Sequence, residues 1–510
     1  MLARVLSSAL IGVDAYRVTV EADLGGGLPA FSVVGLPDAT VRESRERVAA
    51  AVKNSGFHFP ARRITVNLAP AGIRKEGALF DLPIALGILV SSEQIDPFGS
   101  DGVLAVGELS LNGNLRPVRG VLSMAMLARR LRIGAILLPP ENAEEASIVE
   151  GIGVYPVPSL REAIEHLRAP EKASPYLPTG GSEDGSSPFL DLEDVRGQEQ
   201  ARRAVEIAAA GGHNLLFIGP PGSGKTMIAR RIPSILPELT REESLDVTRI
   251  YSVAGLLSAG SSLVRRRPFR APHHSTSDAG LVGGGAYPRP GEASLAHHGV
   301  LFLDELPEFK KNVLELLRQP LEEGSVRIAR AAVSLVFPSA FMLAAAMNPC
   351  PCGYWGDPRC TCTPGEIQRY ASRVSGPLLD RIDIHVEVPR VAYNDLASIA
   401  PGEPSRAVRE RVERARMVQQ SRFASIPGVF TNARMESREL RRFASPDEEG
   451  RRLLRAAMEK LGLSARAHDR ILRVSRTIAD LVGSEHIRAP HLAEAIQYRS
   501  LDRPRWREGG

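Results

Sequence analysis

The sequence predicts a multidomain protein built mainly from α/β units, and three observations lead to this prediction. The chain has 510 residues, which is more than one hydrophobic core normally holds. Short apolar runs alternate with helical patterns over most of its length, as is typical of sheets connected by helices. The last part reads as almost wholly helical. We therefore expect two mixed domains followed by a helical one.

Residues 1–168 are predicted to form an α/β or α+β domain. Strand-like runs such as "YRVTVEADL", "FSVVGL", "RITVNLA" and "GVLAVGEL" alternate with helical runs such as "DLPIALGILVSSEQI" and "LSMAMLARRLRI". Residues 169–188 follow, and they are rich in Pro, Gly and Ser and poor in apolar side chains. This composition predicts a linker.

Residues 189–395 return to the strand–loop–helix pattern, and residues 396–510 are predicted to be helical. Several of the late helical runs begin with a Ser or Asp cap. Residues 401–510 contain 23 Arg and Lys against 15 Asp and Glu, whereas the rest of the chain contains 41 against 44. This asymmetry fits an anionic partner such as nucleic acid, and it fits a solvated arginine-rich helical surface equally well.

The sequence also predicts a cytoplasmic location without a membrane span. The longest apolar runs, "LLFI" and "VLFL", are far shorter than the ~20 residues that a spanning helix needs. The apolar run at the N-terminus is brief and interrupted by Ser7, Ser8 and Asp14, unlike a secretory signal. All four cysteines lie in one segment, so scattered disulfide pairs are not expected.

A phosphate-binding loop is predicted in "HNLLFIGPPGSGKTMIARRI", which reads as an apolar strand, a glycine-rich turn and a helix. Its glycines allow backbone N–H groups to surround phosphates. Lys225 is expected to reach the β and γ phosphates, and the Thr226 hydroxyl is expected to bind Mg²⁺. The predicted cofactors are therefore ATP and Mg²⁺. The nucleotide-binding residues are Gly219, Pro220, Pro221, Gly222, Ser223, Gly224, Lys225 and Thr226.

Two further strands are predicted to deliver polar side chains to the same site. Asp304 and Glu305 follow the apolar run "VLFL", where Asp304 is expected to hold Mg²⁺ through water and Glu305 to activate the attacking water. An acidic pair after a strand is also compatible with a helix cap. The run "FMLAAAMN" ends in Asn348, whose amide is expected to orient that water. The predicted chemistry is hydrolysis of a nucleoside triphosphate.

The four cysteines form a C-x-C-x7-C-x-C pattern directly after Asn348. Four thiolates are a common ligand set for structural Zn²⁺, and the neighbouring prolines and glycines favour tight turns around an ion. The spacing differs from the usual C-x2-C, so a redox-sensitive cluster and the absence of any role remain alternatives. The predicted zinc ligands are Cys350, Cys352, Cys360 and Cys362.

The motifs "GPPGSGKT", "GVLFLDE", "AAAMNP" and "SGPLLDRIDI" occur in an order that resembles AAA+ ATPases. "RPFRAPHHSTSDAGLVGGG" and "PGEASLAHHGVLFLDELPEF" resemble the magnesium-chelatase-like group, and the chain is similar to the ComM/YifB family over essentially its whole length. The resemblance implies a central AAA+ P-loop α/β domain and a C-terminal helical lid of the magnesium-chelatase type.

This resemblance implies a ring-forming, hexameric ATPase that moves along DNA and drives branch migration of recombination intermediates during natural transformation. Branched or single-stranded DNA and recombination proteins would be its partners. An alternative is a chelatase motor that helps a partner to insert a metal into a porphyrin. A third candidate is an ATP-dependent protease.

The resemblance also assigns roles to arginines near the nucleotide. Arg381 in "GPLLDRIDIH" corresponds to the arginine that reaches the γ-phosphate of the neighbouring subunit, with Arg369 and Arg373 as rivals. Arg466 in "LSARAHDRILRVSRTIADL" corresponds to the sensor-2 position, and Arg473 is expected on the same helical face. The alternative is that these arginines only solvate a lid helix.

Two further segments carry family likenesses. Alternation in "SVRIARA" predicts a hairpin that resembles the pore hairpin of MCM-type helicases, with Arg330 and Arg327 as DNA contacts or as ordinary surface arginines. Residues 1–168 resemble the Lon-protease-like, ribosomal-S5-domain-2-type α+β fold. The positions of the protease serine and lysine are occupied by Leu79 and Leu122, so the resemblance implies the fold without the proteolytic dyad.

Overall fold

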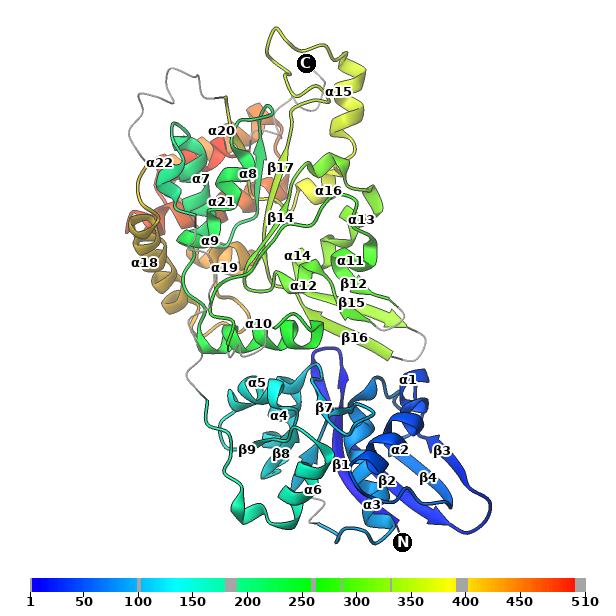
Figure 1. Cartoon of the computed structure of the whole chain (residues 1–510). Coiled ribbons are helices and arrows are strands. Elements are labelled where there is room, and N and C mark those ends of the chain that lie inside the picture. The colour runs from blue at the N-terminus through cyan, green and yellow to red at the C-terminus, as the bar shows by residue number, and fades with distance from the viewer. Residues whose placement is uncertain are drawn as a thin grey trace. The chain divides into compact units, whose positions relative to one another are not determined.

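The computed structural model forms two compact units. The first contains Met1–Ser186 and Arg241–Arg265, and the second contains Ser187–Thr240 and Arg266–Gly510. Figure 1 shows the elements of both. Within the described part of the chain, no helix combines the length and the apolar character that crossing a membrane requires. The structure describes residues 2–98, 102–178, 190–257, 263–285, 288–330, 333–390 and 402–499, and Arg330 and Val333 only in their backbone.

A seven-stranded mixed sheet organises the first unit. Its strand order is β3-β4-β2-β1-β5-β8-β9. The pairs β1–β2 and β2–β4 are antiparallel, whereas β3 is parallel to β4. The pairs β1–β5, β5–β8 and β8–β9 are also parallel. The strands are β1 (Leu2–Ile11), β2 (Asp14–Gly25), β3 (Ala30–Val34), β4 (Arg63–Ala69), β5 (Val103–Ala105), β8 (Ala135–Leu138) and β9 (Gly153–Pro156).

Helices cover both faces of this sheet. Side chains alternate between the faces, so Val5 of β1 joins a core with α3, while Leu6 joins a second core with α4. Helix α3 is buried at every position, as expected from the apolar run between its terminal residues Asp81 and Ser91. The helices are α1 (Ala39–Arg42), α2 (Ser44–Asn54), α3 (Asp81–Ser91), α4 (Val121–Arg130), α5 (Ala143–Ser147) and α6 (Leu160–Arg168), beside the hairpin β6 (Glu108–Leu109) and β7 (Leu115–Arg116).

The beginning of the predicted linker packs onto the first unit. The backbone N–H of Tyr176 donates to the carbonyl of Val154 over 2.7 Å, and its hydroxyl donates to Glu144 over 2.7 Å. A short 3₁₀ turn, Pro170–Lys172, precedes these contacts. Residues 179–189 lie outside the described residues.

Helix α10 (Arg241–Ala254) belongs to the first unit, although its sequence lies between elements of the second. Its Leu245 packs against the core that contains α4. The hydroxyl of Ser252 hydrogen-bonds the buried carboxylate of Glu145, which also accepts the backbone N–H of Leu122 over 2.8 Å. The second unit is therefore interrupted by a segment that completes the first.

The second unit is built on a five-stranded parallel sheet in the order β11-β14-β17-β10-β18. Every residue of β10, β14 and β17 is buried, as expected for parallel strands with both faces covered. Because all strands point the same way, their carboxyl ends meet at one edge. The strands are β10 (Leu215–Ile218), β11 (Phe269–Arg270), β14 (Val300–Leu303), β17 (Met342–Met347) and β18 (Ile384–Glu387).

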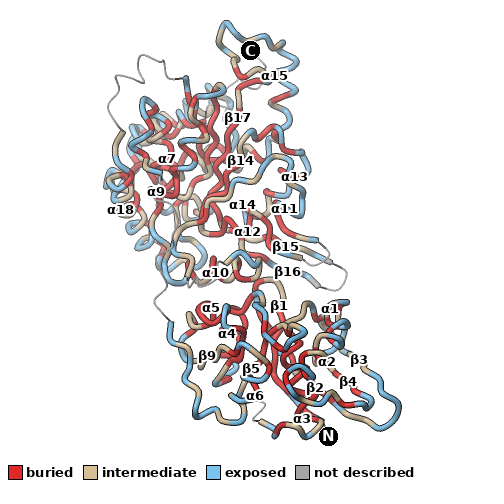
Figure 2. The backbone as a smooth tube through the Cα atoms, viewed as in Figure 1, coloured by how far each residue is buried: buried red, intermediate tan, exposed pale blue. Residues whose placement is uncertain are grey.

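Two separate apolar layers cover this sheet, and Figure 2 shows the buried strands between them. Phe217 and Phe302 face α7 and the C-terminal helices, while Leu216 and Leu303 face a layer that includes α13 and Val326 of β15. The elements of the second unit before residue 391 are η4 (Leu192–Asp194), α7 (Glu199–Gly211), α8 (Lys225–Ala229), α9 (Ile232–Ile235), α11 (Asp278–Val282), β12 (Gly283–Gly284), β13 (Arg289–Pro290), α12 (Glu292–Leu295), η5 (Leu306–Glu308), α13 (Lys311–Leu316), α14 (Arg318–Glu323), β15 (Ser325–Arg330), β16 (Val333–Pro338), α15 (Pro364–Ala371) and α16 (Gly376–Leu379).

The C-terminal part is helical, as predicted, and packs on α7. Gln419 donates from its amide to the carbonyl of Ala210 over 2.9 Å, which fixes the longest helix, α18, to α7. The elements are α18 (Ser405–Phe423), η6 (Asn432–Arg434), α19 (Ser437–Phe443), α20 (Glu448–Leu461), α21 (Ala465–Leu481) and α22 (Ala489–Gln497). The prediction of a mixed α/β protein with a parallel sheet and a helical C-terminal part is confirmed.

Candidate active site

The predicted phosphate loop connects β10 to α8 and has the backbone conformation that its glycines allow. Gly222 and Gly224 have φ angles of 73° and 93°, in the left-handed region. At Gly219, a Cβ atom would lie 2.2 Å from the carbonyl oxygen of Val388. The loop thus requires glycine for conformation at two positions and for close packing at a third, and it ends at the N-terminus of α8.

The ammonium group of Lys225 is held inside this loop. Its Nζ donates to the carbonyls of Gly219 and Pro220 over 2.7 and 2.9 Å, and to Oδ1 of Asn348 over 3.1 Å. Burial lowers the pKa of Lys225, while the negative charges of Asp304 and Glu305 act in the opposite direction. The Lys225 side chain is thus fixed in the loop by two backbone carbonyls and the amide oxygen of Asn348.

Thr226 and Asp304 lie together, as their predicted Mg²⁺-binding roles require. The Thr226 hydroxyl donates to Oδ2 of Asp304 over 2.6 Å. Thr226 lies in α8, after β10, and Asp304 directly follows β14, so the contact joins segments that follow the two strands on either side of β17. Hydroxyl and carboxylate oxygens are the ligand types that Mg²⁺ prefers, and it normally binds few protein ligands together with phosphate oxygens. This pair fits that pattern.

Glu305 is held in a left-handed backbone conformation, with φ 51° and ψ 48°. Its backbone N–H donates to Oδ1 of Asp304 over 2.9 Å, and its Oε2 lies 3.5 Å from Nδ1 of His274. More than half of the Glu305 side chain is exposed to solvent, as a water-activating base requires. His274 was not predicted as a site residue. The only signal for it was "FRAPHHS", which supported the family resemblance without assigning a role.

The predicted arginines have partners away from this cluster. Arg381 is 13% exposed and forms an ion pair with Glu322 of α14. Arg373 binds both carboxylate oxygens of Glu308 over 3.0 Å, and Arg369 donates to the carbonyl of its helix neighbour Gly365 over 3.2 Å. The structure thus joins Lys225, Thr226, Asp304 and Asn348 by direct contacts, with Glu305 adjoining Asp304, and records other contacts for the arginines.

The two predicted arginines of α21 have different environments. Arg466 lies in the first turn, is 69% exposed and donates to Asp380 over 3.1 Å. Arg473 is half-buried and donates from Nε to the carbonyl of Met435 over 2.9 Å. Burial lowers the pKa of Arg473. Arg466 is therefore the one of the two that is accessible to a ligand.

The predicted hairpin is present as β15 and β16, which pair antiparallel from Ser325 opposite Pro338 to Arg330 opposite Val333. Arg327 is 63% exposed and lies 3.3 Å from Glu323. The Arg330 side chain lies outside the described part of the structure.

Both leucines at the positions of a protease dyad lie in apolar surroundings. Leu122 is fully buried in α4, and Leu79 packs against both cores of the first unit. A leucine side chain has neither a nucleophile nor a group that accepts a proton.

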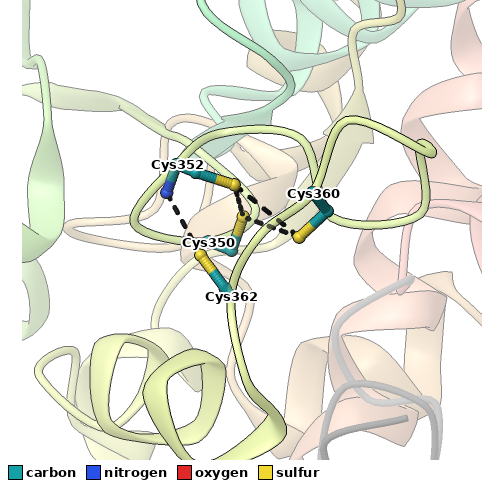
Figure 3. Close-up of side chains that lie close together, drawn as sticks. All are labelled: Cys350, Cys352, Cys360 and Cys362. Carbon is teal, nitrogen blue, oxygen red and sulfur yellow. Dashed lines mark hydrogen bonds between the residues drawn. The ribbon is translucent and has the colours of Figure 1, made fainter.

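The four cysteine side chains converge in the loop between β17 and α15, and we call residues 350–362 the cysteine knuckle (Figure 3). All four Sγ atoms lie within 4.8 Å of one another. The Sγ of Cys350 lies 3.4 Å from that of Cys352 and 3.9 Å from that of Cys360. Tetrahedral Zn²⁺ with bonds of about 2.3 Å separates its sulfur ligands by about 3.8 Å. The arrangement is consistent with a structural zinc site.

The four thiols differ in their environments, because burial raises the pKa of Cys350 to about 12 whereas backbone N–H groups stabilise the thiolate of Cys352. Cys352 donates its backbone N–H to Sγ of Cys362 over 3.4 Å. Burial by itself would raise the pKa of Cys352, but hydrogen bonds from the backbone of Tyr354 and Thr361 lower it to about 6. Since a metal ligand must be a thiolate, the environment of Cys352 in particular favours metal binding.

Three family models match: "Magnesium chelatase, subunit ChlI" over residues 191–396, "Subunit ChlI of Mg-chelatase" over residues 20–142, and "Magnesium chelatase, subunit ChlI C-terminal" over residues 402–499. The chain is 46% identical over 507 residues to the competence protein ComM of Haemophilus influenzae, covering 98% of each chain.

Other relatives cover the whole chain or a part of it. The YifB protein of Escherichia coli is 44% identical over 97% of this chain and 96% of its own length. A Lon protease of Rhizobium meliloti is 26% identical over 36% of this chain and 24% of its own length. The matches to ComM and YifB run over nearly the full length of both proteins. The chain therefore belongs to the ComM/YifB family of magnesium-chelatase-like AAA+ ATPases.

Proposed function

We propose that this protein is a ring-forming, hexameric ATPase that moves along DNA and drives branch migration of recombination intermediates, as in natural transformation. The observation that carries the proposal is the assembled cluster of Lys225, Thr226, Asp304, Glu305 and Asn348 at one sheet edge, in a chain that matches the competence protein ComM almost end to end.

The residues of this cluster divide the work of ATP hydrolysis. The loop amides and Lys225 bind the phosphates, and Thr226 and Asp304 hold Mg²⁺, which would neutralise phosphate charge when bound. Glu305 withdraws a proton from the attacking water, which the Asn348 amide orients. These groups stabilise charge that grows in the transition state, and such stabilisation is usually a large share of catalysis.

Arg381 is proposed to act on the nucleotide of a neighbouring subunit. Its ion pair with Glu322 must open for the guanidinium to reach a γ-phosphate. The Nε of Arg381 is buried without a hydrogen-bond acceptor, so one donor of the guanidinium is unsatisfied in this arrangement. Arg466 would approach the nucleotide from the lid.

The DNA contact is proposed at the hairpin of β15 and β16 through Arg327 and Arg330. Support comes from the antiparallel pairing of the two strands and the exposure of Arg327. The basic composition of residues 401–510 adds positive charge that would attract the phosphate backbone. Arg330→Ala is expected to keep ATP hydrolysis and to abolish unwinding.

The first unit is proposed to have a Lon-type fold that functions in oligomerisation or DNA contact. Leu79 and Leu122 exclude the serine–lysine dyad of such a protease at those positions. A casein-degradation assay is expected to show no proteolysis.

The cysteine knuckle is proposed to bind Zn²⁺ through all four thiolates. The fit of the sulfur separations to a tetrahedron supports this assignment. Metal analysis of the purified protein is expected to find one zinc per chain, and replacement of the cysteines by serine is expected to remove it.

The test of the function is unwinding of forked and four-way DNA with and without ATP. We expect ATP-dependent unwinding that Lys225→Ala abolishes, because that variant cannot bind the phosphates. Glu305→Gln is expected to bind ATP, to hydrolyse it very slowly and to accumulate as a ring. A protein that hydrolyses ATP but leaves every DNA fork intact would contradict the motor function.

A chelatase motor is the second candidate, because all three matching family models describe a magnesium chelatase subunit. In that case ATP hydrolysis would respond to a porphyrin-binding partner and would be indifferent to DNA. Stimulation of ATP hydrolysis by forked DNA therefore separates the two candidates.

A further inference from the structure

The cysteine knuckle touches the phosphate loop. Gly353 lies between the first and second pairs of cysteines, and a Cβ atom built on it would lie 2.4 Å from Cδ and 2.8 Å from Cγ of Pro221. Pro221 belongs to the sequence "GPPGSGKT" that surrounds the phosphates. The knuckle backbone therefore approaches the proline ring more closely than any residue with a side chain would allow.

The cysteine knuckle begins two positions after Asn348, which contacts Lys225. Asn348 accepts from Nζ of Lys225, and only Pro349 separates it from Cys350. Cys350 is fully buried, and its carbonyl accepts the backbone N–H of Gly353 over 3.0 Å. One turn of chain thus joins the metal-ligand position, the contact with Pro221 and the contact with Lys225.

Nothing in the local secondary structure fixes the shape of this turn. Residues 350–362 contain neither helix nor strand and are described as turns and irregular backbone. Their backbone hydrogen bonds are local, such as Asp357 to Tyr354 and Cys360 to Asp357, both 2.9 Å. Ordering such a segment costs conformational entropy that these bonds alone do not offset, whereas a four-coordinate metal can supply the missing free energy.

A displacement of Gly353 would be transmitted through Pro221 to the rest of the phosphate loop. Its ring is part of the backbone and has no side-chain rotamer with which to yield. The next residues, Gly222 to Gly224, are the ones whose N–H groups face a bound phosphate. A shift of Gly353 is therefore expected to move the nucleotide site itself.

We propose that the cysteine knuckle is a metal-dependent brace for the phosphate loop. Zn²⁺ bound by the four thiolates holds Gly353 against Pro221 and Asn348 against Lys225, and loss of the metal lowers the affinity of the site for a nucleoside triphosphate. This inference rests on the proposed ATPase function and the proposed zinc site. It adds that zinc binding controls the nucleotide affinity of the ATPase site.

The first test measures binding of a fluorescent ATP analogue with Mg²⁺ to the full-length protein. The protein is compared as purified, after a zinc-selective chelator has been applied and removed, and after Zn²⁺ has been added back. We expect removal of zinc to weaken binding about tenfold, equivalent to about 1.4 kcal/mol, and the added Zn²⁺ to restore it. Unchanged affinity in the metal-free protein, or purified protein without zinc, would overturn the brace.

The second test uses the contact itself. Gly353→Ala is expected to keep its zinc and to weaken nucleotide binding, because the new methyl group pushes on Pro221. Combining it with Pro221→Ala removes Cγ and Cδ, and the double variant is expected to bind more tightly than Gly353→Ala alone. Metal content is measured on each variant. Additive effects of the two substitutions would contradict a coupling through this contact.

Gly356→Ala is the matched control, because Gly356 lies in the same knuckle and has a φ angle of 87°, close to the 84° of Gly353. Both substitutions force a side chain into the left-handed region, so they share the backbone strain. Equal loss of nucleotide affinity in both variants would assign the effect to strain and overturn the proposed contact.

These measurements separate the inference from the function on which it rests. Wild-type protein that binds no nucleotide would contradict the ATPase assignment. Protein that binds nucleotide equally well with and without zinc would contradict the brace alone. Neither result depends on a measurement of DNA unwinding.

Discussion

The amide of Asn348 accepts a hydrogen bond from Nζ of Lys225 over 3.1 Å, although 123 positions separate the two residues. The contact exists because β17 lies directly beside β10, with Met347 opposite Ile218. Asn348 directly follows β17, and the phosphate loop that leads to Lys225 directly follows β10, so the predicted water-orienting amide meets the predicted phosphate-binding lysine at one sheet edge.

Asn348→Ala is expected to lower kcat by about 10²- to 10³-fold while nucleotide affinity changes only a few-fold. The reason is that an orienting amide acts mainly on the transition state, whereas Lys225 and the loop amides hold the ground state. Steady-state kinetics together with binding of an ATP analogue measure the two effects. If affinity fell as much as kcat, Asn348 would instead act by positioning Lys225.

His274→Ala is expected to raise basal ATP hydrolysis a few-fold. Nδ1 of His274 lies 3.5 Å from Oε2 of Glu305 and competes with water for that carboxylate. His273→Ala is the control, since the two rings are neighbours, with centroids 4.0 Å apart, but Nδ1 of His273 contacts Ser275. A loss of hydrolysis in His274→Ala would show that the histidine instead holds Glu305 in its productive orientation.

Ser252→Ala is expected to increase amide hydrogen exchange of α10 by about tenfold, because one hydrogen bond to a charged group contributes about 1.5 kcal/mol or more. The hydroxyl binds the buried carboxylate of Glu145, which also fixes the backbone of Leu122. Ser244→Ala on the same helix controls for the effect of the substitution on helix stability. Unchanged exchange would mean that the other contacts of α10, such as Leu245 in the core and the ion pair of Arg249 with Asp14, hold the helix without this hydrogen bond.

The unfolding free energy of the second unit is expected to fall in mild acid because of His297. Burial, together with the charge of His298, lowers the pKa of His297 to about 3, and its Nδ1 accepts the backbone N–H of Ala340 over 2.9 Å. An unfolded histidine has a pKa of about 6.5. Its contribution is therefore complete above that pH and is lost between pH 6.5 and 3, by up to about 1.4 kcal/mol per pH unit.

Denaturant unfolding at pH values from 4 to 8 measures this effect. His297→Asn keeps an acceptor for the Ala340 N–H but cannot titrate, so its stability is expected to depend less on pH than that of the wild type. Identical pH dependence in both proteins would assign the acid sensitivity to other groups.

Some elements were predictable because their signal is local. The strand "RITVNLA" appears as β4 with the same limits, and the helical run "DLPIALGILVSSEQI" appears as α3, which begins at the same Asp81. By contrast, the polar residues Ser7 and Ser8 interrupt the N-terminal apolar run, yet both are buried in β1. Helices cover both faces of that strand, and the sequence of the strand alone does not indicate which elements pack on its two faces.

The sequence by itself determined the local chemistry of this protein: a glycine-rich turn before Lys225, an acidic pair after one apolar strand, Asn348 after another, and four thiols within 13 residues. Only the tertiary structure decided that β17 lies between β10 and β14, that α10 completes the first unit, that His274 reaches Glu305 and that Gly353 abuts Pro221. Local patterns fix backbone conformation and amphipathicity, whereas the neighbours of a parallel strand or a turn depend on crossover connections and on which apolar faces bury each other.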